Sequence, residues 1–260
     1  MASRPPLPRF IIGGAPRSGT NFLCHALERH PDVYIPRPYI PEPKVFFGKP
    51  RTGEEYRALS ASLFRDAGPR RALGEKTANY FESEIACARI HEHVPEVRMI
   101  FVVREPVARA YSNYLWSRKN GLETLPFEEA VELEGQRASP LPPEQWHARP
   151  FDYLCRGRYD VFARRYYERF GRDRVMFFLY ETMITEPEKV LDAVQAFIDV
   201  DPRPLDVSAL GVINSARETG PPIDATLNQV LRARMAPAVR DFQALTGVDV
   251  GPWGYDPPRV

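Results

Sequence analysis

Hydrophobic and polar residues follow one another along this chain in a pattern that predicts strands and helices in regular succession. Short, mostly apolar stretches predict strands at Phe10–Ile12, Val33–Ile35, Arg71–Thr77, Arg98–Val103 and Val175–Tyr180. The stretch that ends at Val103 is apolar from Met99 onward, as expected of a strand that is buried on both faces.

Apolar residues at helical spacing follow most of these strands. They predict a helix that starts near Thr20 and stops before Pro31, and further helices at Glu54–Ala67, Ser83–His93, from Pro106, Phe127–Glu134, within Phe151–Phe170, Glu186–Ile198 and Asp224–Leu245. Ser83 can cap its helix, and Pro237 should kink or split the last one. The alternation predicts a single α/β domain with a central parallel sheet flanked by helices, and with ligands at the carboxyl ends of the strands.

Three segments depart from this alternation. Residues 36–47 contain four prolines, which rule out a helix and favour a stiff, extended loop that can hold a side chain at a reaction centre. Asn120–Pro150 is a long excursion, expected to form a lid or an acceptor wall. Residues 1–9 are expected to be a disordered lead-in to one domain over residues 10–260.

Composition narrows the class of protein. A chain of 260 residues can bury one substantial core, and its net charge of +1 argues against a general nucleic-acid binder. The three cysteines are far apart and the five histidines lack ligand spacing, so we expect neither a disulfide framework nor a metal site. Without a long apolar run or a signal peptide, we expect a cytoplasmic protein with no membrane partner. The oligomeric state is left open.

The most informative stretch is Phe10–Leu23, in which an apolar strand passes through a glycine-containing turn into a helix. Such a turn directs backbone N–H groups and the positive end of a helix dipole at one point, which predicts a bound phosphate. Two of its glycines have Walker A spacing, but Thr20 and Asn21 stand where that loop has Lys and a hydroxyl residue. The cation comes earlier, as Arg17, which weakens the metal–nucleotide interpretation. An ordinary strand-to-helix turn is the alternative.

This turn resembles the 5′-phosphosulfate loop of sulfotransferases that use 3′-phosphoadenosine 5′-phosphosulfate (PAPS). The resemblance implies that the donor's 5′-phosphate is held by Arg17, Ser18, Gly19, Thr20, Asn21 and Phe22. Val103–Tyr114 is similar to the family's 3′-phosphate segment, which implies that Arg104 and Ser112 hold the 3′-phosphate. Arginine suits this role because its planar fork matches phosphate oxygens. The alternative is a surface ion pair for Arg104 and a solvated helix position for Ser112.

Two further stretches resemble the heparan sulfate and bacterial branch of that family. Gly74–Phe81 is similar to its Lys-Thr/Ser-Pro-x-Tyr segment, which implies that Lys76 lies near the transferring sulfuryl group. Pro41–Phe47 resembles its Lys-Glu-Pro-x-Phe-Phe segment, which implies that Glu42 is the base. In this chain a proline replaces the family's Lys, and one added residue precedes the aromatic pair. A solvated lysine and a surface carboxylate are the alternatives.

Weaker resemblances complete the predicted site. Arg156–Tyr159 resembles the stretch that opens the helix lining the donor site, which implies donor contacts from Arg158 and Tyr159, whereas Tyr180–Pro187 resembles an architectural segment. Many relatives close a Lys-Gly-Arg loop over the 3′-phosphate, and Arg217 is its candidate substitute here. The residues expected at the acceptor are Lys44, Tyr80, Trp116 and Trp146, and the catalytic set is Glu42, Lys76 and Arg17.

The resemblance implies sulfuryl transfer from PAPS to a hydroxyl or amine, which leaves adenosine 3′,5′-bisphosphate (PAP) and needs no metal. Catalysis would depend mainly on alignment and charge stabilisation. The expected acceptor is a small molecule or a carbohydrate, and the near-neutral charge disfavours a highly sulfated polymer. The size and arginine-rich composition resemble bacterial enzymes of specialised metabolism. An atypical P-loop kinase that binds magnesium ATP and a non-catalytic nucleotide-binding module are the alternatives.

Overall fold

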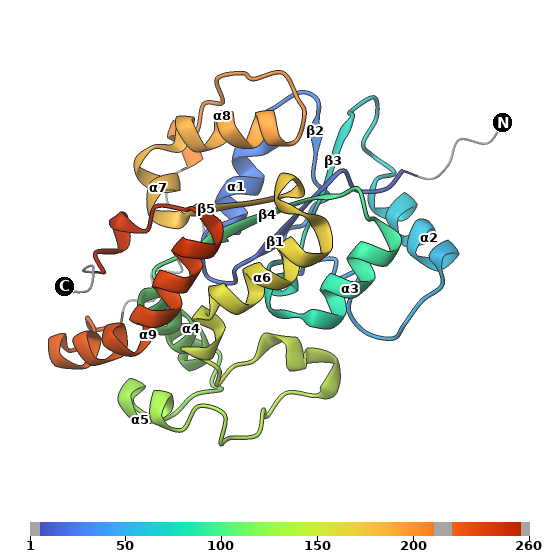
Figure 1. Ribbon diagram of the computed structural model, residues 1–260. Helices are drawn as coiled ribbons and strands as arrows, with labels where there is room; N and C mark the ends of the chain where they lie inside the picture. Colours follow the sequence, from blue (N-terminus) through green and yellow to red (C-terminus); the bar gives the residue numbers. More distant parts are fainter. Residues whose placement is uncertain (1–5, 211–219, 256–260) are drawn as a thin grey trace.

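A five-stranded parallel sheet forms the centre of the computed structural model, which describes residues 6–210 and 220–255 (Figure 1). Its strands lie in the order β2-β3-β1-β4-β5. Their bounds are β1 Phe10–Gly14, β2 Val33–Tyr34, β3 Ala72–Lys76, β4 Arg98–Val103 and β5 Val175–Leu179. All four neighbouring pairs are parallel, so every strand ends at the same edge. The predicted α/β class is confirmed.

Helices cover both faces of the sheet, which explains why its strands are apolar on both sides. Ile11, Met99 and Phe101 point into a core shared with α3 (Glu84–His93), α6 (Tyr159–Phe170) and α9 (Ala225–Thr246). Ile12 and Ile100 point the other way, into a core shared with α1 (Thr20–Leu27) and α8 (Pro187–Phe197). Figure 1 shows these two helical layers on opposite sides of the sheet. Alternate residues of one strand thus enter opposite cores.

The remaining elements are short or lie at the rim. They are α2 Gly53–Leu63, η1 Ala78–Glu82, α4 Pro106–Lys119, α5 Phe127–Glu132, η2 Pro143–Ala148, η3 Cys155–Gly157, η4 Arg172–Arg174, α7 Tyr180–Thr185, η5 Ser208–Leu210 and η6 Gly251–Trp253. Ser83 caps α3 as predicted, because its hydroxyl accepts a hydrogen bond from Ala86 N over 3.1 Å. Pro237 was expected to kink or split the last helix, and no split occurs: α9 runs unbroken through this residue and changes direction along its length (Figure 1).

Packing fixes much of the excursion between residues 120 and 150. Phe127 of α5 packs with Tyr114 of α4 in a third apolar cluster. The buried carboxylate of Glu123 pairs with Arg137 over 2.7 Å and accepts a hydrogen bond from Tyr153. The first half of this segment is therefore part of the folded body, and its second half reaches the site described below.

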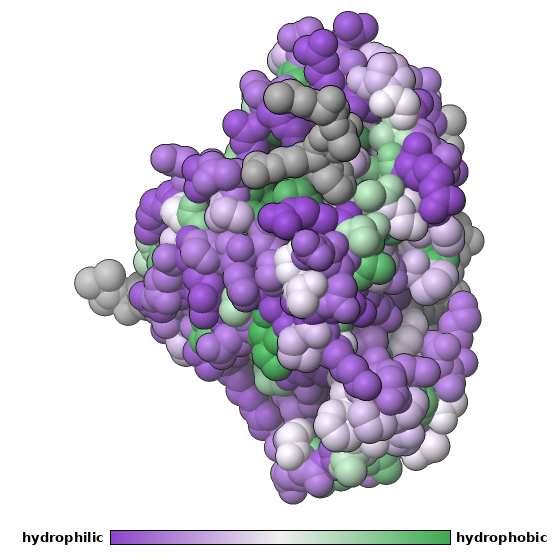
Figure 2. All heavy atoms as spheres, turned by 90° about the vertical axis from the view of Figure 1, so that its right-hand side faces the viewer, coloured by the Kyte–Doolittle hydropathy of each residue, from purple (hydrophilic) through white to green (hydrophobic). Residues whose placement is uncertain are grey.

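The chain start also differs in part from expectation. Residues 6–9 were expected to belong to a disordered lead-in, but Ser60 Oγ donates to Pro6 O over 2.7 Å and Arg9 N donates to Leu73 O over 2.8 Å. Residues 1–5 lie outside the described residues. Among those that are described, no helix combines the length and the apolar character needed to cross a membrane. Figure 2 shows a mostly hydrophilic surface on the side that carries α2 and α3, with hydrophobic residues in small, separate groups.

Candidate active site

The predicted site residues lie at the carboxyl ends of three neighbouring strands, β3, β1 and β4. The register places Ile12 of β1 opposite Lys76 of β3 on one side and opposite Ile100 of β4 on the other. The turns that follow these strands carry Arg17, Thr77 and Arg104. Since parallel strands end together, side chains far apart in the sequence meet there.

The turn after β1 has the shape of an anion-binding loop. A Cβ on Gly14 would lie 2.6 Å from Phe81 Cβ, and a Cβ on Gly19, whose φ is +82°, would lie 2.8 Å from the Tyr180 ring. Both positions therefore require glycine. Helix α1 begins directly after Gly19, so its first N–H groups face the turn, where they can bind phosphate oxygens. The buried Ser18 hydroxyl has no hydrogen-bond partner among the described residues, which also suits an added anion.

The two predicted phosphate segments touch one another. Arg17 Nε donates to Ser112 Oγ over 3.2 Å, and Arg104 Nη1 donates to Arg17 O over 3.3 Å. The Arg104 guanidinium also lies 5.1 Å from the centre of the Tyr180 ring, which packs against Gly19. One aromatic ring thus contacts both segments. The structure brings Arg17, Arg104 and Ser112 together at one end of the sheet, as a single doubly phosphorylated donor requires.

The donor contacts predicted for Tyr159, Arg158 and Arg217 have different outcomes. Tyr159 is 1% exposed, and its hydroxyl donates to Arg104 O over 2.9 Å, so it positions the Arg104 turn from beneath. Arg158 is half-exposed and forms an ion pair with Asp160 over 2.9 Å. Arg217 lies outside the described residues. The structure thus corrects the donor contact expected of Tyr159, whereas the contact expected of Arg158 stays a prediction.

A carboxylate pair behind Arg104 fixes its turn. Glu181 Oε1 accepts from Glu105 N over 3.0 Å, and Glu181 Oε2 accepts from Trp253 Nε1 over 2.8 Å. Tyr255 OH donates to Glu105 Oε1 over 2.6 Å. The segment predicted to be architectural therefore supports the donor side of the site, together with residues from the far end of the chain.

The predicted base and the predicted cation form an ion pair on the other side of β1. Lys76 Nζ lies 2.6 Å from Glu42 Oε1, and the two side chains are 5% and 13% exposed. Ala78 N also donates to Glu42 Oε1, over 3.1 Å, so both contacts use the same oxygen. Lys44 lies close by, half-buried. Burial lowers its pKa and Lys76 adds to this effect, whereas Glu42 opposes it.

The predicted acceptor residues have mixed outcomes. Tyr80 is fully buried and cannot line an open acceptor site, because its hydroxyl donates to Glu75 and accepts from Phe46 N. Trp116 lies partly buried on α4, and its acceptor role stays a prediction. Trp146 is 59% exposed in η2 and donates from Nε1 to Leu141 O over 3.0 Å.

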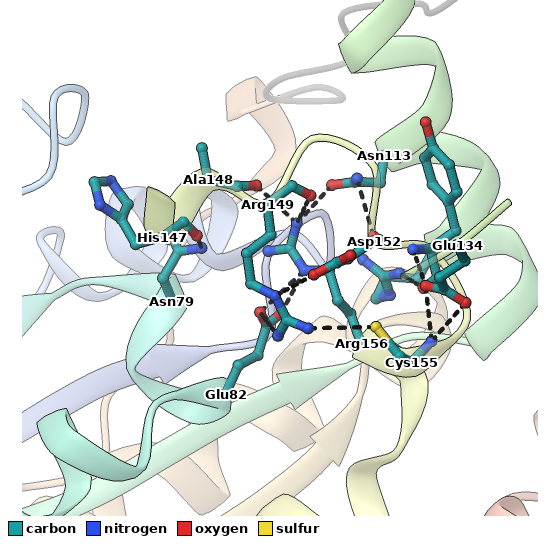
Figure 3. A network of polar contacts seen from close by, with 12 residues as sticks. Asn79, Glu82, Asn113, Glu134, His147, Ala148, Arg149, Asp152, Cys155 and Arg156 are labelled. Atoms are coloured by element: carbon teal, nitrogen blue, oxygen red, sulfur yellow. Dashed lines mark hydrogen bonds and ion pairs between the residues drawn. The ribbon is translucent and has the colours of Figure 1, made fainter. Parts of the chain in front are cut away.

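His147, which follows Trp146, lies beside the residue 44–47 segment and was not predicted as a site residue. Its ring stacks on Phe47 with the centroids 5.4 Å apart, and its carbonyl accepts from Asn79 Nδ2 over 2.8 Å (Figure 3). Burial and the charge of Lys44 lower the pKa of His147, so the neutral ring is favoured. No local motif marks this histidine, because its role arises only when η2 folds back over residues 44–47.

Arg156 is the second residue that sequence reasoning missed. It is 1% exposed and donates from Nε to both oxygens of Glu82, over 2.9 and 3.0 Å (Figure 3). Its Nη1 donates to Asn113 Oδ1 and to Ala148 O, each over 3.0 Å. Asn113 follows Ser112 on α4, and Ala148 follows His147. The buried guanidinium of Arg156 thus joins α4, which carries Ser112, to the η2 turn, which carries His147.

One group of side chains among the described residues has the spacing of metal ligands. Glu134, Asp152 and Cys155 each offer an atom within 4.8 Å of the others. These atoms are already engaged: Glu134 accepts from Tyr153 N and Cys155 N, and Arg149 donates to Asp152 and Cys155. Burial raises the pKa of the Cys155 thiol to about 12, which disfavours a thiolate ligand. The contacts favour a structural role for this group.

Comparison with known proteins agrees with this geometry. The sulfotransferase domain family matches residues 7–210. The chain is 30% identical over 196 residues to heparan sulfate glucosamine 3-O-sulfotransferase 3B1 of Mus musculus, covering 74% of this chain and 46% of that protein. It is 28% identical over 209 residues to bifunctional heparan sulfate N-deacetylase/N-sulfotransferase 4 of Mus musculus, covering 75% and 23%. A crystal structure of a sulfotransferase from Alicyclobacillus acidocaldarius matches with a TM-score of 0.77 and 27% identity, covering 96% of this chain and 100% of that one.

The chain therefore belongs to the sulfotransferase domain family. This confirms the family and the fold that the sequence predicted. The chain spans less than half the length of the two curated relatives described above.

Proposed function

We propose that this protein transfers the sulfuryl group of PAPS to a hydroxyl or amine of a small-molecule or carbohydrate acceptor and releases PAP. The observation that carries the proposal is the convergence of Arg17, Arg104 and Ser112 at the start of α1, one strand away from the Glu42–Lys76 pair. A doubly phosphorylated nucleotide needs two cationic pockets, and the acceptor needs a base beside them.

The donor side recognises two phosphates. The N–H groups of the loop, Thr20 and Arg17 bind the 5′-phosphate, and Arg104 with Ser112 binds the 3′-phosphate. Charge-assisted hydrogen bonds from arginine are among the strongest available for this purpose. The contact between Arg104 and the Arg17 carbonyl supports one continuous donor site.

The reaction is an in-line displacement at sulfur. The acceptor oxygen or nitrogen forms a bond to sulfur while its proton passes to Glu42, and the bond from sulfur to the bridging phosphate oxygen breaks. Because Lys76 and Ala78 N both bind Glu42 Oε1, the second carboxylate oxygen takes the proton of the acceptor. Lys76 and Arg17 stabilise the negative charge that develops on the bridging and sulfuryl oxygens. Since side chains neutralise this charge, the proposal includes no metal, and turnover should withstand a chelator.

The acceptor side is formed by the residue 44–47 segment and the η2 turn. Lys44 and His147 provide polar groups there, and Phe47 provides an apolar ring. This mixture suits a sugar or a small polar molecule, and the names of two relatives refer to heparan sulfate. A cytoplasmic location and a role in bacterial specialised metabolism are also part of the proposal and are supported by composition and family resemblance alone.

Two measurements test the proposal. PAP should raise the melting temperature without magnesium, whereas magnesium ATP should not; the reverse result would favour a kinase. Incubation with PAPS and a pool of sugars and small hydroxyl compounds should yield a product that carries one added SO₃ group by mass spectrometry. Binding of PAP without turnover of any acceptor would favour a non-catalytic nucleotide-binding module.

A further inference from the structure

We propose that Glu75 is a positioning residue of this active site, which fixes the segment that presents Glu42 by way of the hydroxyls of Thr77 and Tyr80. The inference rests on the proposed sulfotransferase function. It gives Glu75 and Thr77 roles that the sequence did not predict, and it replaces the acceptor role expected for Tyr80.

Two series of hydrogen bonds start from the same oxygen of Glu75 and end at backbone amides of the segment. Glu75 Oε1 accepts from Thr77 Oγ1 over 2.7 Å and from Tyr80 OH over 3.0 Å. The same two hydroxyls accept from backbone amides, Thr77 Oγ1 from Lys44 N and Tyr80 OH from Phe46 N, each over 3.1 Å. The carboxylate thus turns both hydroxyl protons toward itself and leaves their lone pairs for the segment.

The deep burial of the Glu75 carboxylate is unfavourable for the stability of the fold. Glu75 is 1% exposed, and Thr77 and Tyr80 are fully buried. Glu75 Oε2 has no hydrogen-bond partner among the described residues. A buried carboxylate without a full set of hydrogen-bond partners destabilises the folded state, and an apolar residue of the same volume would be more stable there. We infer that this carboxylate is retained because it holds the hydroxyls that bind Lys44 N and Phe46 N.

The chain next to Glu42 explains why these two amides matter. Pro43 follows Glu42 and has no N–H, so Lys44 N is the first backbone donor after Glu42 that can hold the segment. The carbonyls are held separately: Arg51 donates to Val45 O and Phe47 O, and Arg89 donates to Phe46 O and Gly48 O. Glu75 therefore completes the anchoring of a segment whose carbonyls are already fixed.

Two neighbouring residues of β3, Glu75 and Lys76, both hold the segment that carries Glu42. Successive residues of a strand point to opposite sides, so Lys76 reaches Glu42 directly while Glu75 holds the backbone of the same segment from the other side. Loss of the Glu75 anchor should displace Glu42 relative to Lys76 and leave the donor loop after β1 in place.

Four variants test this inference. Glu75→Leu and Thr77→Val remove acceptors, whereas Glu75→Gln and Thr77→Ser keep them. We expect the first two to lower kcat on the order of 10- to 100-fold, as for a base misplaced by about 1 Å, with PAP affinity unchanged within about twofold. The two conservative variants should retain most of the turnover. Ser60→Ala, which removes a buried hydroxyl that donates to Pro6 O, is the control for general destabilisation.

Hydrogen exchange gives a readout that does not depend on catalysis. Amides of residues 44–47 should exchange faster in Thr77→Val and in Tyr80→Phe than in the wild type, while the loop after β1 keeps its protection. If Glu75→Leu does not fold, these two variants carry the test. Unchanged exchange and unchanged kcat in both would overturn the inference. A wild-type protein that binds PAP without turnover, with faster exchange in the variants, would instead contradict the proposed function alone.

Discussion

Arg17 and Ser112 are 95 positions apart in the chain, yet Nε of the first donates to the hydroxyl of the second over 3.2 Å. The contact joins the loop predicted for the 5′-phosphate to the helix predicted for the 3′-phosphate. Ser112→Ala should therefore weaken PAP binding on the order of 3- to 10-fold, because it removes one direct hydrogen bond and loosens Arg17. Calorimetric titration with PAP and with adenosine 5′-phosphate separates the two effects, since the second ligand has no 3′-phosphate.

Arg104 should contribute more to donor affinity than any neighbouring cation. Arg104→Ala removes a charged hydrogen-bond donor to the 3′-phosphate and the contact with Arg17 O, so PAP affinity should fall on the order of 100-fold. Arg174→Ala is the matched control, because Arg174 forms an exposed ion pair with Glu96. Unchanged PAP affinity in the Arg104 variant, measured by calorimetry, would exclude the assigned 3′-phosphate role.

Glu42 should affect turnover without affecting donor binding. Glu42→Gln keeps the shape of the side chain and removes its basicity, so kcat should fall on the order of 100-fold or more while PAP affinity stays the same. The control is Glu54→Gln on the exposed side of α2. Initial rates with PAPS and the identified acceptor give the comparison, and near-normal turnover would show that another group takes the proton.

The buried guanidinium of Arg156 should be a large source of stability. Arg156→Met leaves Glu82, Asn113 and Ala148 O without their shared donor, and loss of one partner of a buried ion pair costs about 3 to 5 kcal/mol. Arg158→Met breaks a half-exposed pair with Asp160 and should cost less than about 1 kcal/mol. Urea unfolding of both variants measures the difference. Equal losses of unfolding free energy would mean that Arg156 is not the connection between α4 and the η2 turn.

Glu75 should make the stability of the fold depend on pH. Burial raises the pKa of Glu75 from 4.5 to about 7, against the opposing effect of hydrogen bonds from Thr77 and Tyr80. A raised folded-state pKa gives stability that is complete below about pH 4.5 and is lost as the pH rises through about 7. Relative to Glu75→Gln, the wild type should therefore lose up to about 3 kcal/mol of unfolding free energy between pH 5 and pH 8. A constant difference across this range, measured by urea unfolding, would exclude the shift.

The sequence predicts best what depends on short-range patterns. Apolar runs and helical spacing located the strands and helices. The resemblance to two phosphate segments predicted that Arg17, Arg104 and Ser112 serve one site, and the structure brings them together because each motif follows a strand. Glu42 and Lys76 were predicted from separate segments, and their ion pair follows from the placement of both at the carboxyl edge of the sheet.

What the sequence missed depends on long-range packing. His147 and Arg156 act through contacts with residues tens of positions away, and no local spacing encodes those contacts. Tyr80 was expected at the acceptor, whereas its hydroxyl is used inside the core.

Tyr255 and Trp253 brace the turn that carries Arg104, although they lie some 150 positions later. A truncated chain that ends before residue 253 would keep every motif of the nucleotide site. It would nevertheless lose the two side chains that support the Arg104 turn. Trimming this tail should therefore lower PAP affinity while the acceptor side stays intact, so an inactive trimmed protein would say little about whether its reacting groups were assigned correctly.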